Sequence, residues 1–120
     1  MEATYKNKQK IIATGLGVIS PIGQDVDTFW HHACQGKSGI RHSELAKSLD
    51  LQSTCVGSIN FDRTRNEFLQ EIGIQYPRHI EFALEATRQA LHQSCLLTNK
   101  AGDTRIGVCM GTAVAGTTEM

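Results

Sequence analysis

Two short apolar runs in this chain each end in a loop of small residues, and this recurrence constrains the fold more than any other feature. Residues 11–13 run into Gly15 and Gly17 near the beginning of the chain. Residues 105–110 run into a loop of glycine, threonine, alanine and valine at residues 111–116. An apolar run that ends abruptly in flexible backbone is typical of a buried strand that enters a tight turn. The sequence therefore predicts a strand at each place.

The first predicted helix follows a loop that contains Pro21 and Gly23. Either Asp25 or Asp27 can cap its amino terminus, because a carboxylate accepts hydrogen bonds from first-turn N–H groups that lack a partner within the helix. Its apolar residues recur at helical spacing: Val26, Phe29, Trp30 and Ala33. We expect the helix to end at Gly36, since glycine is favoured just past a helix.

The second predicted helix covers residues 78–94 and follows Pro77, a residue favoured in the first helical turn. One stripe of this helix is apolar and is expected to face the core: Ile80, Ala83, Leu84, Thr87 and Leu91. The opposite face carries Glu81, Glu85, Arg88 and Gln89. Glu85 and Arg88 are spaced to interact weakly, and we expect this face to meet water.

A weaker strand candidate lies between the two helices, at residues 54–59, and is interrupted by Gly57. The order strand, helix, strand, helix, strand predicts an α/β fold with parallel strands joined by helical crossovers. Ligands of such sheets gather beyond the carboxyl ends of the strands. Only four residues follow Gly116, so the covering element expected after the last loop is missing and the domain is expected to be incomplete.

Composition excludes several classes of function. Lysine plus arginine and aspartate plus glutamate both total 12, so the net charge is zero and no broad field attracts nucleic acid or anionic lipid. The polar leader at residues 1–9 is no secretory signal, and no apolar run reaches the roughly 18 residues that a membrane span needs. A chain of 120 residues can bury one core. We expect a cytoplasmic protein with a small or protein-borne substrate.

The cysteines and histidines give no metal site. The four cysteines, Cys34, Cys55, Cys95 and Cys109, have no paired short spacing and lie within or beside apolar stretches. They are expected to pack as small hydrophobic residues in a reducing compartment. His31 and His32 are adjacent and therefore point to different sides of a helix, and no second ligand pair follows them.

Neither glycine-rich stretch predicts a nucleotide cofactor. Gly15 and Gly17 begin a dinucleotide fingerprint, but Ser20 occupies the position of its third glycine. Lys37 and Ser38 imitate the end of a phosphate-binding loop, although a helix precedes them where that motif requires a strand. The sequence therefore predicts no cofactor.

Four stretches together resemble the opening of β-ketoacyl synthases of fatty-acid and polyketide assembly. They are IIATGLGVISPIG at residues 11–23, DTFWHHACQGKSGI at 27–40, GSINFD at 57–62 and RIGVCMGTAVAG at 105–116. The resemblance spans nearly the whole chain. It implies a thiolase-like layered α/β fold, with residues 1–120 as the amino-terminal part of the family's N-terminal domain and an incomplete half of that fold.

The resemblance also implies an acyltransferase that joins an acyl thioester to malonyl-acyl carrier protein with loss of carbon dioxide. The nucleophilic cysteine and two histidines of the family are expected beyond Met120, so this segment alone is predicted to be inactive. The implied partners are acyl carrier protein and a second ketosynthase subunit, identical or different. In the family, the loop after the last strand lines the acyl pocket, so the resemblance implies Val114 as the first substrate-binding residue and Thr112 as the second. The alternative is that Val114 packs against the sheet.

The chain departs from the family's pattern in two places. Ala113 and Ala115 stand in a loop that is richer in glycine in the family, which implies milder turns or a different pocket shape. Residues 71–77 lack the basic side chains that usually precede the second helix. These departures keep a second hypothesis open, namely a non-catalytic ketosynthase-like partner subunit of the chain-length-factor type, or a decarboxylase-type relative.

Overall fold

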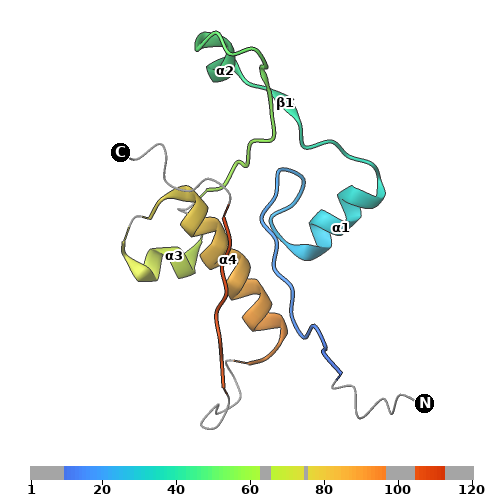
Figure 1. The fold of residues 1–120 in the computed structure, drawn as a ribbon, viewed down its shortest axis with the longest axis vertical. Helices are drawn as coiled ribbons and strands as arrows, with labels where there is room; N and C mark the ends of the chain where they lie inside the picture. The colour runs from blue at the N-terminus through green and yellow to red at the C-terminus, as the bar shows by residue number, and fades with distance from the viewer. Residues whose placement is uncertain (1–9, 63–65, 75, 97–104, 113–120) are drawn as a thin grey trace, which may run out of the picture.

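The chain forms an open arrangement of helices with one small sheet. The computed structural model describes residues 10–62, 66–74, 76–96 and 105–112. Its elements follow the order α1 (Val26–Cys34), β1 (Arg41–His42), α2 (Glu44–Ser48), β2 (Cys55–Val56), α3 (Glu67–Ile72) and α4 (Arg78–Gln93), as Figure 1 shows. The radius of gyration is 19.2 Å, whereas a closed domain of this length would have about 13.6 Å. The helices and the small sheet therefore do not close around a single large core.

Helix α1 begins and ends where the sequence predicts. Asp25 is its N-cap and accepts hydrogen bonds from the Thr28 backbone N–H at 2.7 Å and from the Thr28 hydroxyl at 2.8 Å. The backbone hydrogen bond from Thr28 is the main cause that lowers the pKa of Asp25. After the helix, Gly36 takes a left-handed φ of 66°, which glycine adopts without strain. Trp30 nevertheless remains 66% exposed, so this helix buries less than expected.

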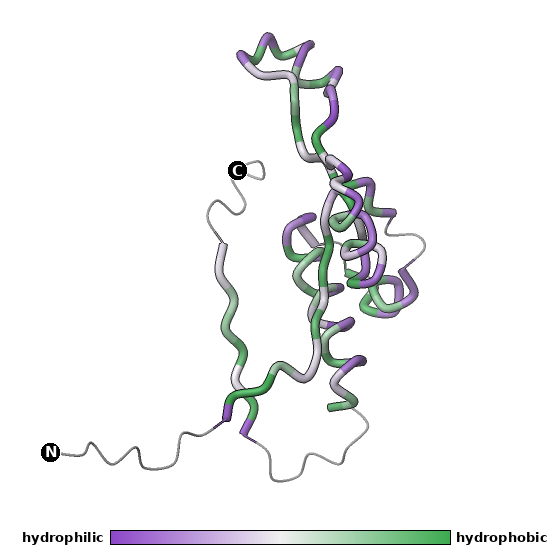
Figure 2. The backbone as a smooth tube through the Cα atoms, turned by 90° about the vertical axis from the view of Figure 1, so that its right-hand side faces the viewer, coloured by the Kyte–Doolittle hydropathy of each residue, from purple (hydrophilic) through white to green (hydrophobic). Residues whose placement is uncertain are grey.

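Residues 41–56 form an arm that projects from the rest of the molecule (Figures 1 and 2). Strands β1 and β2 pair antiparallel, with Arg41 opposite Val56. The short helix α2 lies between the strands and is capped by the Ser43 side chain. The predicted strand at residues 54–59 is confirmed at Cys55–Val56, but its parallel pairing is wrong in the described sheet, because its partner is the nearby β1.

Helices α3 and α4 pack against each other. Asn66 caps α3, and Leu69 of α3 is completely buried. The sequence did not predict α3, whose six residues are too few to show a helical period. Helix α4 starts at the predicted residue and ends one residue earlier than predicted. No described helix is long and apolar enough to cross a membrane.

The two outer strands predicted from the sequence are wrong as local structure. Neither residues 11–13 nor residues 105–110 are paired into a strand in the described structure. Ile11 is 99% exposed, although a buried strand was expected there. A strand is stabilised by hydrogen bonds and side-chain contacts with a neighbouring strand, and these two segments make no such ladder with each other or with the arm. The predicted strand, helix, strand, helix, strand order is therefore not the observed one, although the helices and small sheet remain consistent with an α/β class.

The first glycine-rich stretch packs directly on α4 instead of forming a ligand loop. A Cβ on Gly15 would lie 2.0 Å from the Ala90 carbonyl oxygen, and a Cβ on Gly17 would lie 1.8 Å from that of Ala86. Only glycine permits backbones to approach so closely. The glycines therefore serve contact between residues 15–17 and α4.

Candidate functional site

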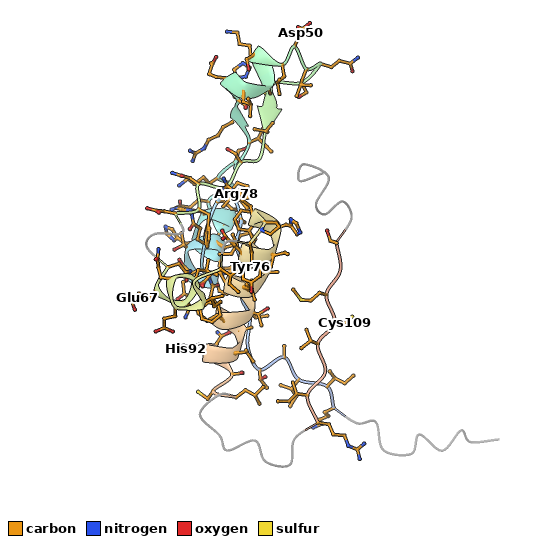
Figure 3. The ribbon with its side chains drawn as sticks, turned by 90° about the vertical axis from the view of Figure 1, so that its left-hand side faces the viewer. Asp50, Glu67, Tyr76, Arg78, His92 and Cys109 are labelled. Carbon is orange, nitrogen blue, oxygen red and sulfur yellow. The ribbon has the colours of Figure 1, made fainter. Side chains whose placement is uncertain are left out.

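The candidate site is a cavity between α4 and the extended segment of residues 105–112. It encloses about 440 Å³, which lies within the range of small-molecule pockets. Figure 3 shows α4 with α3 and Glu67 on one side, and the extended segment that carries Cys109 on the other. The cavity is lined by His79, Ile80, Ala83, Leu84, Met110, Gly111 and Thr112.

The apolar wall of this cavity is the stripe that the sequence predicts on α4. Ile80, Ala83 and Leu84 lie on one face because residues three and four apart are neighbours on a helix. The stripe was expected to face the core, but Ile80 is still 36% exposed. Its apolar surface is therefore open along a cavity.

The polar groups of the cavity are few. Thr112 contributes a hydroxyl and His79 an imidazole, whereas Met110 and the α4 stripe are apolar. Figure 1 shows the segment before Thr112 running beside α4 toward the amino terminus of that helix, where His79 lies. An apolar lining with a few polar groups is the usual composition of a site for a ligand that is largely hydrocarbon.

The opposite side of α4 is closed by a hydrogen-bond network centred on Glu85. Arg88 donates to the two carboxylate oxygens at 2.7 and 2.8 Å, and Asn66 donates at 2.8 Å from the start of α3. Gln89 adds a hydrogen bond at 3.1 Å. The expectation that this face meets water is wrong, because Glu81 and Glu85 are each only 5% exposed. Packing of α3 against α4 removes water, and hydrogen bonds replace it at Glu85.

These contacts decide the charge state of Glu85. Burial alone raises the pKa of a carboxyl group, since it disfavours the charged form. The hydrogen bonds from Arg88, Asn66 and Gln89 oppose this effect and bring the pKa of Glu85 below its ordinary value of 4.5. The same carboxylate raises the pKa of Arg88. Both side chains of the pair are therefore charged at neutral pH.

Two glutamines hold the glycine-rich stretch against the same helix. Gln89 Oε1 accepts a hydrogen bond from the Val18 backbone N–H at 3.1 Å, and Gln93 Oε1 accepts one from Leu16 at 2.6 Å. Gln89 also donates to the Gln24 carbonyl oxygen at 2.7 Å. Helix α4 is thus fixed to residues 15–24 by both close backbone contact and side-chain hydrogen bonds.

The amino terminus of α4 is anchored by aromatic and cationic contacts. Arg78 donates to the Ile59 carbonyl oxygen at 2.6 Å, and its guanidinium lies 5.5 Å from the centre of the Phe82 ring. Phe82 meets Phe61 edge to face, with 5.4 Å between ring centroids. These contacts fix the turn of α4 that carries His79 and Ile80.

Of the two substrate-binding residues predicted from the resemblance, the structure describes one. Thr112 lines the cavity, and Val114 lies outside the described residues, so its role stays a prediction. The sequence interpretation missed Ala83 and Leu84 as site residues, because it assigned their stripe to the core. The signal was present, since one apolar stripe serves equally as core or as pocket wall.

The cysteines and the paired histidines do not form a reactive cluster among the residues described. All four cysteines are exposed, so the prediction that they pack as small hydrophobic residues is wrong in this structure. His32 bonds through Nδ1 to the Ile22 carbonyl oxygen, and its Nε2 lies 3.1 Å from Lys37 Nζ. Within the described ranges, no group of three or more histidine, cysteine, aspartate or glutamate side chains could hold a metal ion.

Comparison with known proteins identifies the family. Residues 8–120 match the family model described as "Beta-ketoacyl synthase, N-terminal domain". The putative polyketide beta-ketoacyl synthase 1 of Streptomyces halstedii is 30% identical over 112 residues, 93% of this chain and 26% of the relative. The 3-oxoacyl-[acyl-carrier-protein] synthase 2 of Coxiella burnetii is 30% identical over 110 residues, 91% of this chain and 26% of the relative. No solved structure gives a significant match.

A third relative extends the similarity to a subunit of a polyketide system. The tetracenomycin polyketide synthase ketoacyl synthase alpha subunit of Streptomyces glaucescens is 31% identical over 115 residues, 96% of this chain and 27% of the relative. Helices, a small sheet and an apolar cavity define only a broad α/β class. The family match is more specific, and this chain belongs to the β-ketoacyl synthase family. It spans about a quarter of the length of the curated relatives that it matches.

Proposed function

We propose that this chain is the amino-terminal part of a 3-oxoacyl-acyl carrier protein synthase that binds the acyl chain of its substrate in the cavity beside α4. The observation that carries this proposal is the position of Thr112. The family resemblance implies that the loop of residues 111–116 lines the acyl pocket, and the presence of Thr112 among the residues that line an apolar cavity supports this proposal. Relatives named as 3-oxoacyl and polyketide synthases support the same class of reaction.

The proposed reaction is a decarboxylative condensation. An enzyme thiolate attacks the acyl thioester, takes the acyl group and releases the donor's sulfur as a thiolate; malonyl-acyl carrier protein then loses carbon dioxide to give a carbanion. The carbanion attacks the acyl carbonyl, forms a carbon–carbon bond and releases the enzyme thiol once a proton is taken up. In this proposal the cysteine and two histidines of the reaction follow residue 120. The role of the present segment is to bind the acyl chain and exclude water from it.

The same proposal covers the setting of the enzyme. We place it in the cytoplasm, as a homodimer or a ketosynthase heterodimer, with acyl carrier protein as its substrate-bearing partner. We also propose that residues 1–120 belong to the first half of a thiolase-like layered fold. The open apolar face of α4 supports that arrangement, because a layered fold covers such a face.

The test is condensation by the full-length protein. Purified enzyme is given an acyl thioester and malonyl-acyl carrier protein, and formation of 3-oxoacyl-acyl carrier protein and carbon dioxide is measured. Val114→Phe should shorten the acyl chains accepted, because a larger side chain reduces the pocket. Release of carbon dioxide without condensation, or condensation only after a second ketosynthase subunit is added, would favour the partner or decarboxylase alternative instead.

A further inference from the structure

We propose that Ala83 of α4 sets the length of the acyl chain that the cavity accepts. This inference rests on the proposed function and adds a specificity-determining residue to it. Ala83 is the smallest side chain that α4 contributes to the cavity, and its neighbours in the wall are Ile80 and Leu84. The space beside a small residue between two large ones is where a hydrocarbon chain can continue along the helix.

The polar and apolar ends of the cavity orient the ligand. His79 lies in the first turn of α4, and Thr112 follows Met110 on the facing segment. Their polar groups suit the carbonyl end of a thioester, which accepts hydrogen bonds. The alkyl chain then extends toward the carboxyl end of α4, past Ala83, because Ile80, Leu84 and Met110 offer apolar contact.

The wall that carries Ala83 cannot move away from an added side chain. On its other side, α4 is bound to the start of α3, because Asn66, the N-cap of α3, donates a hydrogen bond to Glu85 at 2.8 Å. It is also in backbone contact with Gly17, where no Cβ fits beside the Ala86 carbonyl oxygen. Extra volume at Ala83 therefore reduces the cavity instead of displacing the helix.

A position one helical turn beyond Ala83 allows the effect of added bulk to be compared at two distances along α4. Thr87 follows Ala83 along the stripe at a distance of about 6 Å, four residues at about 1.5 Å each. The Thr87 hydroxyl donates to the Ala83 carbonyl oxygen at 2.7 Å, so its hydrogen-bonding need is met within the helix. In this proposal a short acyl chain ends near Ala83, and only a chain long enough to extend past the residues that line the cavity reaches the exposed Thr87. Bulk at the two positions should therefore exclude different chain lengths.

The experiment compares Ala83→Leu, Thr87→Leu and the control Ala33→Leu, an exposed alanine on α1. In the full-length protein, kcat/KM is measured for short, medium and long straight-chain acyl thioesters. Ala83→Leu should lower kcat/KM for medium and long chains by about tenfold or more relative to short chains. Thr87→Leu should affect only the long chains, and Ala33→Leu none. Equal losses at every length, or an unchanged profile, would overturn the proposal.

A second variant and a second readout keep the test decisive. Leu84→Ala enlarges the same wall and should shift preference toward longer chains; this variant decides the matter if thermal melting shows that Ala83→Leu is unfolded. Binding of acyl-pantetheine thioesters, measured by calorimetry, gives the length profile without turnover. Length-dependent binding without condensation would refute the proposed reaction but support the role of Ala83. Condensation with a length profile that neither variant changes would refute the role of Ala83 alone.

Discussion

The two sides of α4 are used in the opposite way from what their amino acids suggest. The side that carries Glu81 and Glu85 is buried, whereas the stripe of Ile80, Ala83 and Leu84 lines an open cavity. At the buried side, Glu85 accepts hydrogen bonds from three different side chains, which offset the loss of water around its charge. Charge type alone therefore does not decide which face of a helix is buried; the available partners do.

The difference has a functional consequence. A face closed by directional hydrogen bonds and backbone contact is fixed in position, because each bond constrains distance and angle. A face left apolar and open can receive a hydrocarbon chain without losing a hydrogen bond. Helix α4 is therefore fixed in position on one side, and on the other side it offers an apolar wall that can adapt to a ligand.

The largest expected effect comes from disrupting the contact between α4 and the glycine-rich stretch at residues 15–17. Gly17→Ala adds a Cβ that would lie 1.8 Å from the Ala86 carbonyl oxygen, so residues 15–18 must move away and the hydrogen bond from the Val18 N–H to Gln89 Oε1 is lost. We expect destabilisation of roughly 3 kcal/mol. Amide hydrogen exchange of α4 in the full-length protein, together with thermal melting, measures it.

A matched glycine provides the control for this change. A Cβ on Gly107 would meet no atom within 4 Å, so Gly107→Ala should alter stability by less than about 0.5 kcal/mol. Equal destabilisation by the two substitutions would contradict the close packing of residues 15–17 on α4.

The next effect concerns the network itself. Glu85→Gln keeps the size of the side chain but removes the charge to which Arg88 donates two hydrogen bonds. We expect a loss of roughly 1–2 kcal/mol, because charge-assisted hydrogen bonds are replaced by weaker neutral ones. Glu71→Gln, at an exposed position on α3, should change stability by less than about 0.5 kcal/mol. Chemical denaturation compares them; similar values for both would mean that the network contributes nothing.

A pH titration sharpens the same comparison. Hydrogen bonds lower the pKa of Glu85 in the folded state below its ordinary value of 4.5. The stabilisation from its charge is therefore complete above about pH 4.5 and is lost as the pH falls through the folded-state pKa. The stability difference between the wild type and Glu85→Gln should shrink over that range. A difference that stays constant from pH 7 to the acid limit would contradict a charged Glu85.

The sequence predicts α1 and α4 well because their signals are local. Asp25 and Gly36 mark the ends of α1, and Pro77 marks the start of α4. The strands were predicted less well, since pairing depends on residues distant in the chain that apolar runs do not specify. The sequence therefore predicts a strand at residues 11–13, although the described structure gives them no strand partner.

The same limit applies to the candidate site and its surroundings, where some residues could be predicted from the sequence and others could not. Thr112 came from resemblance to a family, and the structure gives it a cavity. Burial of Glu85 could not be predicted, because Asn66 donates from 19 residues away and from a helix too short to show a pattern. A pattern analysis assigns glutamate to solvent by default, and only the partner residues reverse that assignment.

The smallest expected effect on stability comes from the open side of α4. Leu84→Gln replaces a half-buried apolar side chain at the cavity wall, so the loss in the 120-residue chain should stay below about 1 kcal/mol. We expect the 120-residue chain to associate through its uncovered apolar surface, and Leu84→Gln should reduce that association. Thr87→Gln, on the same stripe but already polar, is the control and should change association little. Sedimentation velocity separates the two cases, and unchanged association of the Leu84 variant would show that the open face is not the surface through which the chain associates.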